Sequence, residues 1–295
     1  MRLQNIRGVV LITGIFLALI VSGTLGCASV NVDMVQAPMV SNMVDKITDT
    51  KSARLVKDGL PGQILSVTAI TEMSPNNLSL LKESALLYCV YGLFIEDEDP
   101  EYAKELYSIG KEYGLRALKQ DDKFREGLEG GKKISELVDN LGKKYAEALC
   151  WTGLNGGLWL ILSLDDPAVL TEMADIVALV KRSIALDETY FYGTGKIFIG
   201  AYYALVPSFL DPAGGPKNSR KMFQEARSIS DGKFLLLDLF EARYLDTAIR
   251  DQKLFKKRLK DVLSADSGEL KGAYLINELS KMKAKYYLKH QDALF

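Results

Sequence analysis

The sequence predicts an all-α fold in which helical hairpins repeat along the chain to form an α-solenoid. Two short markers recur in step and carry this prediction. The form Asp-x-x-aromatic recurs at intervals of 66 and 44 residues, and it occupies residues 121–124, 187–190 and 231–234. The pair Asp-Pro recurs at intervals of 67 and 45 residues, with its prolines at Pro100, Pro167 and Pro212. Repetition on this scale indicates stacked units that bury a continuous core between neighbours.

The two markers separate an aromatic helix from a charged amphipathic one. Asp followed by Pro suits a helix N-cap and the first helical position. The aromatic helices are predicted at 78–96, 145–164, 190–209 and 234–249. The amphipathic helices are predicted at 100–119, 167–186, 216–229 and 252–264, and a final helix near 270–290 closes the stack. The hairpins are near the tetratricopeptide period of about 34 residues, with insertions.

The insertion in the first interval is "REGLEGGKKISELVDNLGKK", which has the length of one extra helix. Nearer the N-terminus, Pro61 suits the first turn of a helix. The stretch Ser74-Pro75-Asn76-Asn77 is typical of a turn, because Pro and Asn both favour turns.

Residues 184–203, "IALDETYFYGTGKIFIGAYY", fit three structures at first sight: a strand, a phosphate-binding loop or the join between two helices. A G-x-G-x-x-G loop starting at Gly193 needs glycine at position 198, where the chain has Phe198, and no strand precedes it. We therefore expect the end of one helix, a turn capped by Asp187 and the start of the next helix.

Composition argues against several functions. Lys and Arg total 37, Asp and Glu total 38, and the formal charge of −1 gives no electrostatic case for nucleic-acid binding. The one histidine, His290, lies near the C-terminus, so zinc sites and histidine-based catalysis are not expected, and neither is any cofactor. The acidic run Glu96–Asp99 lacks the ligand spacing of an EF-hand loop and precedes a predicted helix N-terminus, where negative charge is favourable.

The N-terminus has the pattern of a secretory signal. Arg2 and Arg7 precede an uncharged run from Gly8 to Gly26, and Thr24-Leu25-Gly26-Cys27 is similar to the lipoprotein box, except that Thr24 stands where Leu is usual. We expect a signal peptide at 1–26, a tether at 27–50 attached through lipidated Cys27, and the repeat domain at 51–295. An uncleaved membrane anchor and a buried helix remain alternatives for the apolar run.

Two further cysteines, Cys89 and Cys150, lie inside apolar helical patterns. Free cysteine behaves there as a small hydrophobic residue. A disulfide between them stays open, because an exported compartment permits one.

The order of several segments resembles one known family, the T component of TRAP transporters, whose members are exported, often lipid-anchored tetratricopeptide-like proteins. The segments are "RLVKDGLPGQILSVTAITEMSPNN", "KYAEALCWTGLNGGLWLILSLDDP", "VKRSIALDETYFYGTGKIFIGAYYALVPSFLDPAGGPKNSRKMFQEARSI" and "SDGKFLLLDLFEARYLDTAIRDQKLFKKRLKDVLSAD". The resemblance covers the chain from Lys51 to Asp266. The first interval of 66 residues departs from an even array.

The resemblance implies a transport accessory and not an enzyme. It implies a periplasmic lipoprotein, on a membrane that the sequence does not identify, working beside a solute-binding P component. It also implies a trimer, a through-hole in the subunit, and a small hydrophobic or organic-acid ligand. An envelope-assembly scaffold that holds other proteins is the alternative function.

Six residues on the predicted aromatic helices are candidates for lining a ligand site or pore. They share one face of each helix, at i, i+4 and i+8 or similar spacing, and are Trp151, Asn155, Trp159, Tyr192, Lys196 and Tyr203. Inner helices of solenoids often carry the binding surface, where aromatic rings stack on an apolar ligand and Lys196 meets a carboxylate. The alternative is plain helix packing, since aromatic stripes at this spacing also build cores. For Arg243, Tyr244 and Asp251 we expect a salt bridge or a cap.

Overall fold

The structure, a computed structural model, describes residues 32–295, with side chains from position 36 onward. The predicted signal peptide 1–26 and the lipidation site Cys27 lie outside the described residues. The chain divides into two compact units, Met1–Met39 and Val40–Phe295, and the helices from α3 onward lie entirely in the second. Every regular element among residues 32–295 is helical, which confirms the predicted all-α fold.

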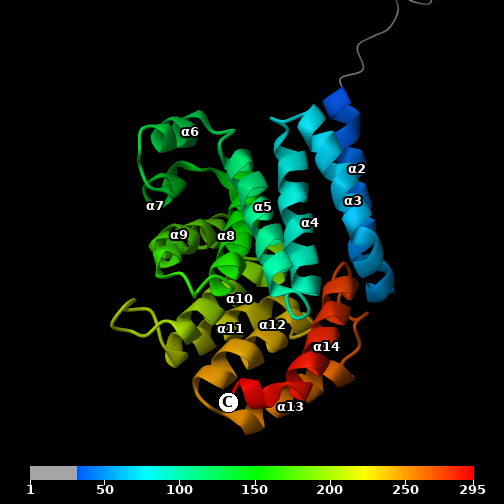
Figure 1. Cartoon of the computed structure of the whole chain (residues 1–295), viewed down its shortest axis with the longest axis vertical. Coiled ribbons are helices and arrows are strands. Elements are labelled where there is room, and N and C mark those ends of the chain that lie inside the picture. Colours follow the sequence, from blue (N-terminus) through cyan, green and yellow to red (C-terminus); the bar gives the residue numbers. More distant parts are fainter. Residues whose placement is uncertain (1–31) are drawn as a thin grey trace, which may run out of the picture. The chain divides into compact units, whose positions relative to one another are not determined.

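The α-helices follow one another along the chain (Figure 1). They are α2 (Val32–Thr48), α3 (Ala53–Met73), α4 (Leu78–Ile95), α5 (Pro100–Leu118), α6 (Asp122–Glu129), α7 (Ile134–Leu137), α8 (Ala146–Ile161), α9 (Met173–Leu186), α10 (Tyr190–Leu205), α11 (Pro216–Ser230), α12 (Leu235–Phe240), α13 (Gln252–Ser264) and α14 (Tyr274–Lys289). The shorter turns are η1 (Val138–Asn140), η2 (Lys143–Tyr145), η3 (Pro167–Glu172), the π-helical segment η4 (Glu241–Asp246) and η5 (Gln291–Ala293).

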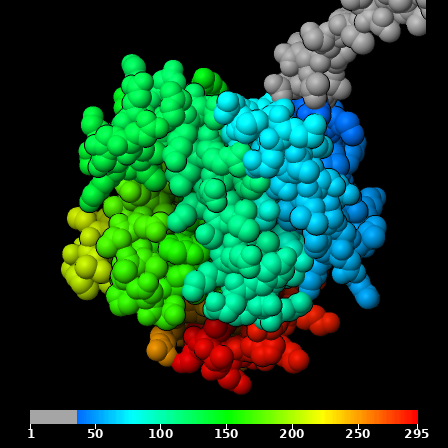
Figure 2. Space-filling model, turned by 45° about the horizontal axis from the view of Figure 1, so that its top comes forward, coloured from blue at the N-terminus to red at the C-terminus, as the bar shows by residue number. Residues whose placement is uncertain are grey.

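Consecutive helices pack as hairpins, as the repeated markers predict. α4 packs on α5, α8 on α9 and α10 on α11, and the α12–η4 segment packs on α13. The closing helix α14 packs on α12 and α13. The hairpins then stack, because α5 also packs on α8, and α8 and α9 both pack on α10. Figure 2 shows the surfaces of α4 and α5 side by side, with the C-terminal segment next to the end of α4. This stacking produces the interior surfaces that hold the cavities described below.

Two of the three Asp-Pro markers start helices as predicted. The Asp99 carboxylate accepts a hydrogen bond from the Tyr102 N–H (3.1 Å) at the start of α5. The Asp166 carboxylate accepts a hydrogen bond from the Ala168 N–H (2.9 Å) at the start of η3, which leads into α9. The third, Asp211, accepts from the Ala213 N–H inside a turn, and α11 begins only at Pro216. The prediction of a cap at Asp211 is therefore wrong, because the chain adds a further turn before the helix.

Replacing Asp99 with Ala is expected to lower the free energy of unfolding by about 1 kcal/mol, the usual cost of losing an N-cap. Loss of the Asp99 carboxylate leaves the Tyr102 N–H at the first turn of α5 without its hydrogen-bond acceptor. Urea denaturation measures the change. Asp99→Asn retains an acceptor oxygen in a side chain of the same shape and should keep most of the stability. An equal decrease in the free energy of unfolding in both variants would contradict the capping role.

The Asp-x-x-aromatic markers all lie at helix junctions, but in three different geometries. Asp121 caps α6 by accepting from the Phe124 N–H (3.1 Å). Asp187 accepts from the Thr189 N–H and hydroxyl in the turn between α9 and α10, which confirms the predicted join. Asp231 ends α11 in a left-handed conformation with φ 50°. The recurrence thus marks turns reliably without specifying one backbone form.

The prediction for Pro61 is wrong: it lies inside α3 and not in the first turn of a helix. The Ser52 hydroxyl accepts a hydrogen bond from the Leu55 N–H (3.3 Å), and this cap starts the helix earlier in the chain. Proline in a helix interior removes one backbone hydrogen bond and displaces the carbonyl of the fourth residue before it. α3 accepts that cost because its apolar stripe, including Leu60 and Ile64, is buried on both sides of the proline.

The insertion of the first repeat interval contributes to the core. It continues the short helix α6 and forms α7, whose buried Leu137 joins the hydrophobic cluster that α5 and α8 share. α4 is the described helix that is long and apolar enough to cross a membrane, and 72% of that segment is buried inside the protein. Its hydropathy is therefore explained by its central position in the stack.

Candidate functional site

One cavity, which we call the aromatic cavity, has a volume of about 630 Å³. It lies between the end of α2, the start of α4, α8, the start of α10 and the loop at Lys271–Gly272. Four aromatic side chains line it, and they are Trp151, Tyr190, Phe191 and Tyr192. A cavity of this size is within the range that holds small ligands.

Trp151 is the fixed wall of the aromatic cavity. It lies on α8, most of which is buried, so neighbouring helices hold it on several sides. Its indole N–H donates a hydrogen bond to the Tyr190 hydroxyl (2.7 Å), and its ring meets the Phe191 ring edge-on with centroids 5.1 Å apart. Burial, and then the nearby Glu147 carboxylate, raise the pKa of Tyr190 well above its usual value, so this hydroxyl stays protonated.

The backbone at the start of α10 is left-handed over three residues, with φ 42° at Phe191, 59° at Tyr192 and 77° at Gly193. Bulky residues rarely adopt this conformation, and such strain gathers at functional sites. The surroundings hold it in place. The Tyr192 hydroxyl donates to the Lys271 carbonyl (2.5 Å), and the Phe234 ring packs against Tyr192 with centroids 5.0 Å apart.

The charged groups of the aromatic cavity fall into an exposed rim and a partly buried interior. Two carboxylates and two ammonium groups form the rim, and they are Asp45, Lys46, Asp49 and Lys271. The interior holds Lys82, Glu83 and Glu147, and Lys82 pairs with Glu147 at 3.0 Å. The rim is thus balanced, and the interior carries one excess negative charge.

That excess charge belongs to Glu83. Its carboxylate accepts a hydrogen bond from the Ser41 hydroxyl (2.7 Å), and within residues 36–295 no cationic group reaches ion-pair distance of it. Burial raises the pKa of Glu83, and Glu147 and Asp45 raise it further, while Ser41 and Lys82 act in the opposite direction. A carboxylate in this setting gains stability when a cation approaches it.

A second cavity, which we call the apolar cavity, has a volume of about 580 Å³. It lies between the end of α8, η3, the start of α9, the end of α10 and the α12–η4 segment. Its walls are almost entirely apolar or aromatic, and they include Leu158, Met173, Phe198, Tyr202, Phe240 and Tyr244. The sequence did not single out these residues as a set, because they come from segments far apart in the chain.

Several side chains of the apolar cavity wall, together with the neighbouring Phe209, are apolar and exposed, and we call them the apolar surface: Leu164, Leu170, Leu205, Phe209 and Leu210. All except Phe209 also line the cavity, and Phe209 precedes Leu210 in the α10–α11 connection. Phe209 is 83% exposed and Leu210 is 71% exposed. Large apolar groups gathered at one place on a surface mark sites of interaction.

The six predicted site residues do not come together at one place. Trp151 and Tyr192 line the aromatic cavity. Asn155 lies fully buried in α8 and donates hydrogen bonds to the Ala85 and Trp151 carbonyls, both at 2.9 Å. It therefore connects α8 to α4 inside the core.

The other three of the six are engaged with charged partners. The Lys111 ammonium lies 4.2 Å from the centroid of the Trp159 ring. Lys196 is buried and bonds to the Glu188 (2.8 Å) and Glu225 (3.0 Å) carboxylates. Tyr203 is also buried, next to Lys181. Two carboxylates thus already balance the charge of Lys196, so its ammonium group is not an unpaired counter-ion for a ligand carboxylate.

The two cysteines in the described part of the chain, Cys89 and Cys150, are free and buried. Burial raises the pKa of Cys150 to about 12, so its thiol is not reactive at neutral pH. The acidic run at 96–99 has structural partners. Glu96 and Asp97 pair with Lys283 (both 2.6 Å), and Glu98 pairs with Lys57. Among residues 32–295, no group of three His, Cys, Asp or Glu side chains is placed to hold a metal ion.

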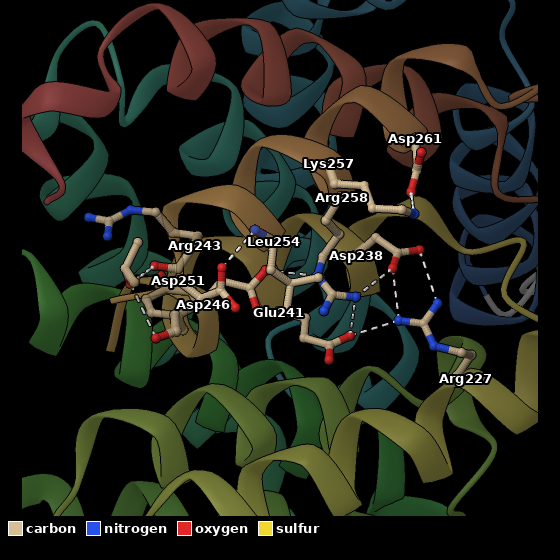
Figure 3. A network of polar contacts seen from close by, with 12 residues as sticks. Arg227, Asp238, Glu241, Arg243, Asp246, Asp251, Leu254, Lys257, Arg258 and Asp261 are labelled. Atoms are coloured by element: carbon tan, nitrogen blue, oxygen red, sulfur yellow. Dashed lines mark hydrogen bonds and ion pairs between the residues drawn. The ribbon is translucent and has the colours of Figure 1, made fainter. Parts of the chain in front are cut away.

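A polar network joins α11, α12, η4 and α13 (Figure 3). Arg227 and Arg258 each bond to both Asp238 and Glu241, and Arg258 also bonds to the buried Asp246 (3.0 Å). The expectation of a cap is confirmed for Asp251, which accepts from the Leu254 N–H at the start of α13. Tyr244 lies at the apolar cavity, and the Arg243 guanidinium lies over its ring.

An array of helical hairpins with two ligand-sized cavities and an exposed apolar surface defines an all-α protein of the helical-repeat class. A family model described as TRAP transporter T-component matches residues 49–295, and the chain belongs to this family. No curated protein matches the sequence. The chain is therefore an accessory of a TRAP transport system, which is a system of the cell envelope.

Proposed function

We propose that this protein docks the solute-binding P component of its TRAP system and shields a small hydrophobic ligand in the apolar cavity. The observation that carries the proposal is the position of that cavity beside the apolar surface. A partner seated on this surface would cover the cavity mouth, so an apolar ligand would pass between the two proteins without contact with water. The process makes and breaks no covalent bond.

The anchoring and assembly proposed from the sequence fit this function. A lipid on Cys27 would hold the protein on the periplasmic side of the envelope, where a solute-binding protein meets its permease. A trimer would present three apolar surfaces to P components. Small organic acids remain candidate ligands only where an apolar body accompanies the carboxylate, because the apolar cavity offers few polar partners.

The double variant Phe209→Asp with Leu210→Asp is expected to weaken binding of the P component at least tenfold. Both side chains are exposed, so the fold is preserved, while two buried carboxylates would be left without partners in the complex. Titration calorimetry with the purified P component measures the change. Leu65→Asp on α3, also 70% exposed, is the control and should bind normally.

A second variant separates docking from ligand shielding. Ala201 is buried and lines the apolar cavity, so Ala201→Phe fills part of its volume. The variant Ala201→Phe should no longer bind an apolar ligand but should still bind the P component.

The double variant Phe209→Asp with Leu210→Asp tests the docking surface itself. If it binds the P component as tightly as the unaltered protein does, the proposed docking surface is wrong.

A further inference from the structure

We propose that the aromatic cavity binds a small organic monocation, a protonated amine with an apolar body, through Glu83 and the surrounding aromatic rings. This site lies on other residues than the apolar cavity and does not depend on the proposed docking of a P component. The proposal rests on the charge of the cavity, the character of its walls and its size.

In the described part of the chain, the ion pairs of the aromatic cavity leave Glu83 without a counter-ion. In the interior, Lys82 is already bonded to Glu147 at 3.0 Å. Glu83 next to it has the Ser41 hydroxyl as its donor, which satisfies one oxygen without neutralising the charge. A partly buried carboxylate without a counter-ion is unfavourable, and a bound cation removes that cost. One excess carboxylate selects a single positive charge.

The walls favour an organic cation over a metal ion. Rings of Trp, Tyr and Phe attract ammonium groups through their negative faces, most strongly in the case of Trp. Trp151 lines this cavity together with the three aromatic residues at the start of α10. A hard metal ion needs several oxygen ligands around it, whereas the interior offers Glu83 and a carboxylate already paired with Lys82.

The walls and rim also argue against an anion. The interior ammonium group of Lys82 is engaged, and the exposed Lys46 and Lys271 are matched in number by Asp45 and Asp49. A volume of about 630 Å³ leaves room for an apolar body beyond the charged group. The chemical class is therefore an aryl or alkyl amine of modest size, and not an acid.

The test compares three probes of one shape on the full chain. Phenylethylammonium, 2-phenylethanol and phenylacetate differ in charge and share the phenyl body. Titration calorimetry measures binding, and tryptophan fluorescence follows it as well, because Trp151, one of the two tryptophans, lies in the cavity wall. The expected order is the ammonium at least tenfold tighter than the alcohol, with the carboxylate weakest. Equal affinity for the three, or tighter binding of phenylacetate, would overturn the proposal.

Variants then locate the charge. Glu83→Gln keeps the shape of the side chain and should weaken phenylethylammonium at least tenfold while leaving 2-phenylethanol unchanged. Glu112→Gln, an exposed carboxylate on α5, is the matched control and should bind as the unaltered protein does. If Glu83→Gln and Glu112→Gln behave alike, Glu83 is not the counter-ion. The probe series on the unaltered chain decides the question independently of how the variants fold.

The pH dependence gives a third readout. The titratable and charged groups around Glu83 are Asp45 from α2, Lys82 beside it on α4, Glu147 from α8 and Tyr190 from α10, and the Ser41 hydroxyl of α2 donates to it. Burial, with Glu147 and Asp45, raises the pKa of Glu83 above its usual value. Phenylethylammonium affinity should therefore fall as the pH is lowered through that raised pKa, and Glu83→Gln should remove this dependence. A pH-independent affinity in the unaltered chain would contradict the role of Glu83.

Discussion

Replacing Arg258 with Met is expected to lower the free energy of unfolding by about 3–5 kcal/mol, because it leaves a buried charge without a partner. Arg258 bonds to three carboxylates in the network of Figure 3. Asp238 and Glu241 keep Arg227 after the substitution, whereas Asp246 is fully buried and loses its one ion-pair partner in the described chain. Guanidinium denaturation at pH 7 measures the loss.

The loss should depend on pH in a definite direction. Burial raises the pKa of Asp246, and Arg258 lowers it, so the variant raises this pKa further. A carboxyl whose folded pKa lies above its unfolded value costs stability at high pH, and that cost disappears as the pH falls toward the unfolded value of about 4. The variant should therefore recover part of its deficit between pH 7 and pH 5. Equal deficits at both values would contradict the assignment to Asp246.

Lys257→Met on the same helix is the matched control. Lys257 pairs with Asp261 at 2.7 Å, but its side chain is 72% exposed. Exposed ion pairs of this kind contribute about 0.3–0.5 kcal/mol. If Lys257→Met lowers the free energy of unfolding as much as Arg258→Met does, the effect comes from the charge of α13 in general and not from the buried partner of Arg258.

Replacing Phe223 with Ala is expected to lower the free energy of unfolding by about 3–5 kcal/mol, the usual cost of removing a phenyl ring from a core. Phe223 is fully buried on α11 and fills the space in front of Gly200 on α10. Thermal and urea unfolding measure the loss. Phe209→Ala is the control. The Phe209 side chain is 83% exposed, so this substitution should change the free energy of unfolding by less than about 0.5 kcal/mol.

The contact between Gly200 and Phe223 allows a sharper test. A Cβ on Gly200 would lie 3.1 Å from the Phe223 ring, which is tighter than ordinary packing. Gly200→Ala should therefore destabilise the unaltered chain by crowding, and destabilise it less, or not at all, once Phe223→Ala has removed the ring. A double-mutant cycle measures this coupling. Strictly additive effects would mean that the two helices do not pack through this pair.

The sequence predicted the hairpins well because their boundaries depend on local chemistry. Asp99 and Asp166 cap helices by bonding to backbone groups two or three residues away, so the pattern alone is sufficient. The limits of α4, α5, α11 and α13 agree with the predicted ranges within one residue. Residues 28–50 gave no comparable signal, and the structure places α2 (Val32–Thr48) there.

The site was harder to predict because it depends on contacts between distant segments. Trp151 and Tyr192 were found as members of aromatic stripes, but nothing local connects them to Glu83 or to the loop at Lys271. The left-handed backbone at Phe191 and Tyr192 was also missed. It is held by Lys271 and Phe234, and bulky residues have no local preference for that conformation. Gly193 was the one available signal of an unusual backbone at this point.

The central claim is that this chain works beside a solute-binding protein. The most direct measurement is a cross-linking capture from native envelopes with the full chain as bait, compared with the double variant Phe209→Asp and Leu210→Asp, and read by mass spectrometry. The account predicts a periplasmic solute-binding protein as the dominant, saturable partner, lost with the double variant. An outer-membrane assembly machine as the dominant partner, or no solute-binding protein at all, would contradict it.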